Sequence, residues 1–174
     1  MSAPDNFNYE HCRFLIERFD SSYDAINNKG SFYIGLNTFI LGGICAGYIT
    51  LEKRIDPTCI FWIQFSLLFA WCILSIFFTI KAISPFLRDN ENKEHTPALI
   101  FFWGIARFNQ NTFIDKFEKQ TQESILTDMR IQVHCLASGL KRKYANLRRA
   151  SLCLILEFSF LVLFFVYLII NLKP

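Results

Sequence analysis

The stretch SFYIGLNTFILGGICAGYIT at residues 31–50 decides the fold, because it contains no charged side chain. A second uncharged stretch, CIFWIQFSLLFAWCILSIFFTI, occupies residues 59–80, and residues 151–172 depart from this pattern only at Glu157. A hydrocarbon core roughly 30 Å thick is crossed by about 20 apolar residues of helix, which satisfy every backbone group internally. The sequence therefore predicts an all-α integral membrane protein with three transmembrane helices.

The composition argues against an enzyme. The chain has 174 residues, and the three spans leave little material for an independent catalytic core. We find no GxSxG, Walker, HExxH or CxxC motif. The six cysteines are divided between spans and polar segments, which does not indicate a disulfide framework, and the polar first 30 residues do not read as a cleavable signal peptide.

The distribution of basic residues predicts the topology. Three spans place the N-terminal segment and residues 81–150 on the same side of the membrane, and that side carries 15 of the 18 Lys and Arg residues. Positively charged segments stay in the cytoplasm. We therefore expect residues 1–30 and 81–150 to be cytoplasmic and the C-terminus to emerge on the other side.

The two predicted cytoplasmic segments each contain an amphipathic helix. Apolar residues recur at spacings of three and four in residues 9–26, and we expect a helix there, followed at residues 27–30 by a break or by the point of entry into the membrane. Residues 88–97 form a polar loop, and residues 98–106 are apolar but too short to span a membrane. From Gln122 a second apolar stripe runs into the third span without a proline, which predicts one helix of about 50 residues. The two stripes predict a small cytoplasmic helical bundle.

Glu157 is the costliest residue in the spans, because a carboxylate inside a membrane costs a few kcal/mol unless it is paired, protonated or hydrated. It is either a pore-lining or gating group, or a residue that reaches Arg148, Arg149 or lipid headgroups. Asn37 and Gln64 are milder candidates of the same kind, typical of contacts between helices. Gly43 and Gly47 provide a small-xxx-small face suited to a contact within the chain or between subunits.

A ligand with a phosphate group needs cationic donors near an aromatic surface. One set of residues supplies both: Trp103, Arg107, Lys141, Arg142 and Lys143. The alternative is that Trp103 anchors at the membrane interface and the basic residues bind the inner leaflet. His11 and Cys12, with His134 and Cys135, are the best metal ligands available, but their spacing does not place two ligands on one helix face, so we predict no metal site.

Three segments carry a resemblance to a known family. They are RFDSSYDAINNKGSFYIGLNTFILGG at residues 18–43, IFFWGIARF at residues 100–108 and IQVHCLASGLKRKYANLRRA at residues 131–150. Together with the hairpin of two spans, this order resembles the transmembrane effectors of Pycsar, a bacterial anti-phage system. The resemblance rests on the following residues: Asp24, Asn27, Asn28, Lys29, Asn37, Gln132, Lys143 and Leu147, with the FFWG segment at 101–104.

The resemblance implies a mechanism and a location. A partner pyrimidine cyclase makes cyclic CMP or cyclic UMP, the nucleotide binds the cytoplasmic part, the bacterial inner membrane loses integrity, and the infected cell dies. No separate cofactor or nucleic-acid polymer is implied, and a homo-oligomer is expected. Two other functions stay open on the residues alone, a membrane scaffold that docks a partner through its tail helix and a small ion channel.

Overall fold

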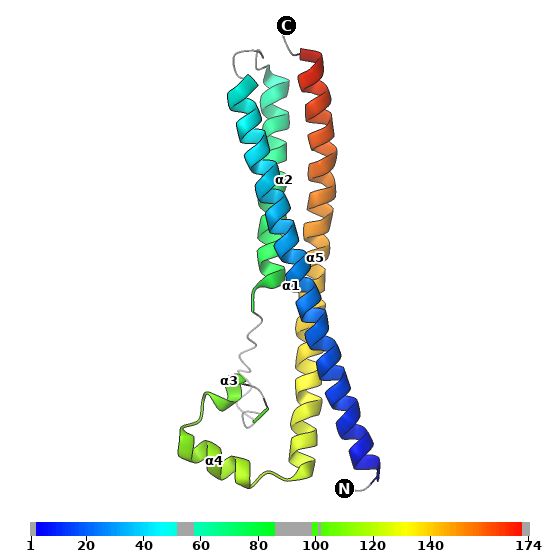
Figure 1. Cartoon of the computed structure of the whole chain (residues 1–174), viewed down its shortest axis with the longest axis vertical. Helices are drawn as coiled ribbons and strands as arrows, with labels where there is room; N and C mark the ends of the chain where they lie inside the picture. The colour runs from blue at the N-terminus through cyan, green and yellow to red at the C-terminus, as the bar shows by residue number, and fades with distance from the viewer. Residues whose placement is uncertain (1–2, 52–57, 86–98, 101, 172–174) are drawn as a thin grey trace. The chain divides into compact units, whose positions relative to one another are not determined.

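The computed structural model describes residues 3–51, 58–85, 99–100 and 102–171, and every regular element in these ranges is a helix (Figure 1). The helices are α1 (Ala3–Leu51), α2 (Cys59–Ile83), α3 (Phe102–Ile105), α4 (Gln110–Glu118) and α5 (Gln122–Asn171). Three of them, α1, α2 and α5, are long and apolar enough to cross a membrane. The predicted all-α fold with three transmembrane helices is confirmed.

The chain divides into two compact units. Unit 1 comprises residues 1–24 and 85–141, and unit 2 comprises residues 25–84 and 142–174. Helices α1 and α5 each begin in unit 1 and end in unit 2, whereas α2 belongs to unit 2 and both α3 and α4 belong to unit 1. The predicted polar loop at residues 88–97 lies outside the described residues.

The predicted break at residues 27–30 is wrong, because α1 is a single helix from Ala3 to Leu51. Asn27, Asn28 and Lys29 are exposed on the helix surface, where polar side chains remain hydrated without ending the helix. Gly30 is buried, and a Cβ atom placed on it would collide with Ile83 Cγ2 of α2. The glycine therefore serves a close approach of two helices within unit 2.

The prediction of one helix from Gln122 into the third span is confirmed, since α5 has 50 residues. Its start is fixed by a reciprocal capping interaction, in which the amide of Ser124 donates to Thr121 Oγ1 at 3.2 Å and the amide of Thr121 donates to Ser124 Oγ at 3.0 Å. Such caps satisfy backbone donors that have no partner within the helix. In α4, Asn109 caps in the same way by accepting from the amide of Thr112 at 2.8 Å.

Within unit 1, α1 packs on α5 through the two predicted apolar stripes. Cys12 of α1 and Met129 of α5 are buried, and the Tyr23 hydroxyl donates to the carbonyl oxygen of Leu136 at 3.0 Å. Burial of the phenol, with a further contribution from the Asp20 carboxylate, raises the pKa of Tyr23. The stripes are thus used as contact faces.

Within unit 2, each of the three long helices presents buried residues at spacings of three and four. An apolar core contains Ile40, Ile44, Phe61, Leu68 and Phe164. The outer surface is apolar as well, and Phe39 and Ile169 are 78% and 76% exposed. A large exposed apolar surface is stable in lipid rather than in water, which agrees with the membrane assignment.

Candidate functional site

Four polar residues meet inside unit 2, and we call them the polar layer: Asn37 of α1, Cys72 and Ser75 of α2, and Glu157 of α5. All four side chains are completely buried. The three helices bring them together because each residue occupies the same three-and-four stripe as the apolar core. Two of the predicted intramembrane candidates, Asn37 and Glu157, therefore lie in one site.

Asn37 organises the polar layer. Its side-chain nitrogen donates to the carbonyl oxygen of Tyr33 at 2.6 Å and to Ser75 Oγ at 3.1 Å. The side-chain oxygen of Asn37 consequently faces Cys72, whose thiol lies 3.4 Å from it. Both amide hydrogens are used in these contacts, so the amide is held in one orientation.

Glu157 contributes the carboxyl group of the polar layer. Both its carboxylate oxygens are buried, and neither has a hydrogen-bond partner among the residues that the structure describes. The Cys72 thiol is its polar neighbour. The structure does not bring the carboxylate to Arg148 or Arg149, whose side chains are exposed.

Gln64 is not part of the polar layer. It precedes Cys72 by eight residues on α2, which is about 12 Å along the helix axis. Its side-chain oxygen is buried without a hydrogen-bond partner in the described part of the chain. Cys72 and Ser75 were not among the predicted site residues, although Cys72, Ser75 and Thr79 form a small polar stripe at spacings of three and four that marks the contact face of α2.

Ser75→Ala tests the hydrogen bonding of the polar layer. The substitution removes the acceptor for one amide hydrogen of Asn37, and we expect it to lower the free energy of unfolding by about 1 kcal/mol. Thermal unfolding of the purified protein in detergent measures the change. Ser66→Ala is the matched control, since Ser66 is exposed on the same helix, and an equal loss in both variants would contradict the assignment.

The predicted ligand-binding residues lie in different surroundings. Arg107 is exposed just after α3, and Lys141 and Arg142 are exposed on α5. Trp103 belongs to α3, and its side chain lies outside the described part. Trp103, Arg107 and Lys141 belong to unit 1, whereas Arg142 and Lys143 belong to unit 2.

Lys143 is buried, with 6% of its surface exposed. Its ammonium group donates to the carbonyl oxygens of Ala82 and Ile83 at 2.9 and 3.0 Å. These carbonyls belong to the last turn of α2, where they have no partner within the helix. Burial lowers the pKa of the Lys143 ammonium. In this structure Lys143 caps α2 rather than facing solvent.

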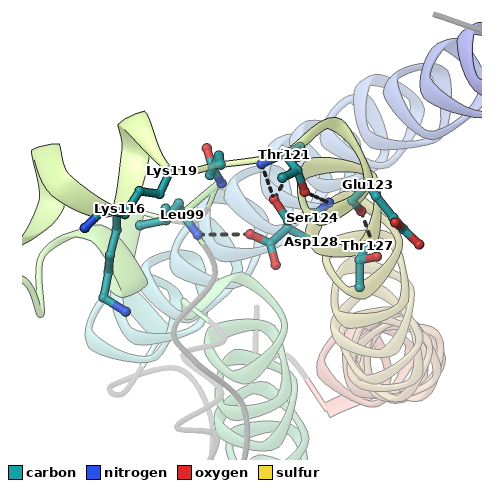
Figure 2. A pocket seen from close by; sticks show the side chains of 9 residues that line it. Leu99, Lys116, Lys119, Thr121, Glu123, Ser124, Thr127 and Asp128 are labelled. Atoms are coloured by element: carbon teal, nitrogen blue, oxygen red, sulfur yellow. Dashed lines mark hydrogen bonds between the residues drawn. The ribbon is translucent and has the colours of Figure 1, made fainter.

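Unit 1 contains a pocket of about 560 Å³ between α4, the start of α5 and the residues before α3 (Figure 2). This volume is in the range of roughly 300–1,000 Å³ that is typical of small-molecule sites. The pocket is lined by Leu99, Lys116, Lys119, Gln120, Thr121, Glu123, Ser124, Thr127 and Asp128. The amide of Leu99 donates to Asp128 Oδ2 at 3.3 Å, which joins the segment before α3 to α5.

The charges of the pocket are divided between its walls. Lys116 and Lys119 come from the end of α4, and Glu123 and Asp128 come from the first turns of α5. Lys116 Nζ also lies 5.0 Å from the centre of the Phe108 ring, and Lys119 Nζ lies 3.1 Å from Asp115 Oδ2 at the surface. The predicted basic residues Arg107, Lys141, Arg142 and Lys143 do not line this pocket.

No described part of the chain covers the glycine face of α1. A Cβ atom placed on Gly42, Gly43 or Gly47 meets no atom within 4 Å. Gly43 and Gly47 therefore make no close helix contact with the residues that the structure describes. Among the residues that the structure describes, no group of three or more His, Cys, Asp and Glu side chains is arranged to hold a metal ion.

Comparison with protein families gives a match to the Pycsar effector protein domain over residues 11–170. Searches of curated proteins and of solved structures return no match. The match extends through both units, including the pocket, the polar layer and all three long apolar helices. The chain belongs to the Pycsar effector protein family and is a membrane effector of antiviral defence.

Proposed function

We propose that this protein impairs the integrity of the bacterial inner membrane when it binds cyclic CMP or cyclic UMP made by a partner cyclase. The infected cell then dies before phage is released, which is abortive infection, and the protein catalyses no reaction itself. The observation that supports this proposal best is α5, an uninterrupted helix of 50 residues with its first turns in the pocket of unit 1 and Glu157 in the polar layer of unit 2. A conformational change at the pocket of unit 1 could therefore be transmitted to the polar layer of unit 2 through α5.

The pocket of unit 1 suits a cyclic nucleotide. A cyclic phosphodiester carries a single negative charge, which Lys116 and Lys119 can pair. Glu123 and Asp128 supply acceptors for the hydroxyl group of a ribose or the amino group of a cytosine. Trp103 and Arg107 are proposed to contribute stacking and charge from the segment around α3. Lys143 is less suited to the phosphate, because a ligand would have to displace two hydrogen bonds to α2.

The proposed orientation follows from the charge distribution. Residues 1–30 and 81–150, which carry 15 of the 18 Lys and Arg residues, face the cytoplasm where the nucleotide is made, and the C-terminus faces the periplasm. The open glycine face of α1 supports a homo-oligomer, because small residues allow helices of neighbouring subunits to approach closely.

Dye uptake tests the function. Cells that express the protein with an active pyrimidine cyclase should take up a membrane-impermeant dye, and cells that express it with an inactivated cyclase should not. Membrane fractionation establishes that equal amounts of protein are inserted in both cultures. Unchanged permeability at equal insertion would reject the proposal.

Two double variants test the location of the nucleotide. We expect K116A with K119A to weaken binding of cyclic CMP or cyclic UMP at least tenfold, because a charge-assisted hydrogen bond to phosphate contributes about 1.5–3 kcal/mol. K141A with R142A is matched in charge but changes exposed residues outside the pocket. Calorimetric titration of the full-length protein in detergent measures both. A larger loss in the second variant would move the site to the basic residues of α5.

A small ion channel is a second candidate, favoured by the buried carboxyl group of Glu157. A channel predicts discrete single-channel currents in planar bilayers after nucleotide addition. General membrane damage predicts leakage without a defined conductance.

A further inference from the structure

The polar layer has more hydrogen-bond acceptors than donors. Asn37 uses both of its amide hydrogens on Tyr33 and Ser75, so its side-chain oxygen faces Cys72 as an acceptor. The two carboxylate oxygens of Glu157 are also acceptors, and they have no hydrogen-bond donor in the described part of the chain. The Cys72 thiol, a weak donor, lies between these groups. A positive charge is the missing component.

No side chain of the described residues supplies that charge. The basic residues nearest in sequence, Arg148 and Arg149, are exposed, and the Arg149 guanidinium lies 5.7 Å from the centre of the Phe78 ring. The buried ammonium of Lys143 is used by Ala82 and Ile83 at the end of α2. An uncompensated carboxylate inside a low-dielectric bundle is too costly to persist.

We propose that the polar layer is a site for a monovalent cation, bound at the carboxyl group of Glu157. A divalent ion is a poorer match. Ca²⁺ and Mg²⁺ prefer six or more oxygen ligands, and no group of three or more His, Cys, Asp and Glu side chains in the described part of the chain is arranged to hold a metal ion such as Zn²⁺. The four residues are completely buried in contact with one another, and of the monovalent cations a proton is the one that needs no additional volume. A proton is therefore the expected occupant, and an alkali ion is the alternative that the experiment distinguishes.

Cation release has a structural consequence. When Glu157 loses the cation, a bare carboxylate remains in the centre of three packed helices, and its hydration favours separation of the helices. Binding of the cation and closure of unit 2 are then linked, so that conditions that remove the cation promote opening. This inference concerns unit 2 by itself and does not depend on the nucleotide.

The test is the thermal unfolding of the full-length protein in detergent between pH 5 and pH 8. The other titratable side chains near the polar layer are the thiols of Cys72 on α2 and Cys153 on α5 and the phenol of Tyr33 on α1, which is hydrogen bonded to Ser151. Thiols and phenols ordinarily titrate above this interval, whereas a carboxyl group does not. If a proton is bound, the wild-type Tm falls as pH rises. Glu157→Gln, which imitates the protonated acid, should lose that part of the fall, on the order of 5 °C.

Glu118→Gln is the matched control, because Glu118 is exposed at the end of α4, lines neither the pocket nor the polar layer, and should keep the wild-type pH profile. Replacing choline chloride by NaCl or KCl at pH 8 tests the alkali ion, which would raise the wild-type Tm but not that of Glu157→Gln. Identical responses of the wild type and Glu157→Gln to both pH and alkali ions would overturn the proposal.

A chemical experiment on the wild type covers the case in which Glu157→Gln does not fold. Dicyclohexylcarbodiimide is an apolar reagent that modifies protonated carboxyl groups within membranes. Mass spectrometry should locate the adduct at Glu157, with a yield that declines as pH rises or as a bound alkali ion protects the carboxyl group. Absence of the adduct throughout the pH range, in the presence and absence of alkali ions, would contradict the site.

Discussion

Gly30→Leu is expected to destabilise unit 2 by about 3 kcal/mol, the largest effect of the substitutions considered, because it places a side chain where α1 and α2 are in contact. A Cβ atom on Gly30 already collides with Ile83 Cγ2 and lies 3.5 Å from Thr79 Cγ2. Ile83 is β-branched and has few alternative rotamers, so the helices have to move apart. Thermal or denaturant-induced unfolding in detergent measures the loss.

The control for this prediction is Gly35→Leu, also on α1. A Cβ atom on Gly35 meets no atom within 4 Å, and the residue is exposed, so its substitution should leave unfolding unchanged within about 0.5 kcal/mol. Gly30→Ala combined with Ile83→Ala tests the cause. The double variant should be more stable than the sum of the two single changes predicts, since removal of the Ile83 branch makes room for the new Cβ atom. Additive losses would show that another contact is responsible.

Lys143→Met is the second substitution with a large expected effect. It leaves the carbonyl oxygens of Ala82, which is buried, and Ile83, which is half-buried, without their donor at the end of α2. We expect a loss of about 2 kcal/mol, because an orphaned buried acceptor loses most of its hydration without a replacement bond. Met is chosen because it fills a similar volume and restricts the change to the loss of the ammonium group.

The same substitution has a functional readout. The hydrogen bonds of Lys143 are expected to hold α2 in the closed arrangement of unit 2. Lys143→Met should then cause dye uptake without an active cyclase, at protein levels at which the wild type causes none. Lys141→Met changes an exposed neighbour on the same helix and should retain wild-type stability and silence. A stable, silent Lys143→Met protein would show that the cap contributes neither to folding nor to closure.

Some features of this fold can be predicted from the sequence because they depend on the local pattern of residues alone. The absence of proline from residue 122 to the end of the third span indicates the whole of α5. Glu157 is conspicuous as the single charge in an apolar run, and the sequence leaves open whether it lies inside the helix bundle or reaches Arg148, Arg149 or lipid headgroups. The structure shows it buried inside unit 2. Asn37 could be assigned to a helix contact on the same reasoning.

Other features depend on contacts between distant residues, and local pattern misrepresents them. Gly30 with its polar neighbours resembles a helix end, but its role is set by Ile83, which lies 53 residues later. Lys143 belongs to a basic run that suggests solvent or lipid, yet its partners are carbonyl groups of α2. Cys72 and Ser75 read as small residues of an apolar span until Asn37 and Glu157 are placed beside them.

Because α5 is continuous, rotation of its first turns about the helix axis would also rotate the residues that it places inside unit 2. The helix is unbroken from residue 122 to residue 171. One residue inserted after Lys141 would therefore rotate every later side chain by about 100° about the helix axis. The face that carries Leu147, Ala150, Glu157 and Phe164 would then point elsewhere, whereas an insertion of four residues would nearly restore it. The rotation of α5 about its axis, as much as its position along that axis, therefore determines which of its residues face the other helices of unit 2.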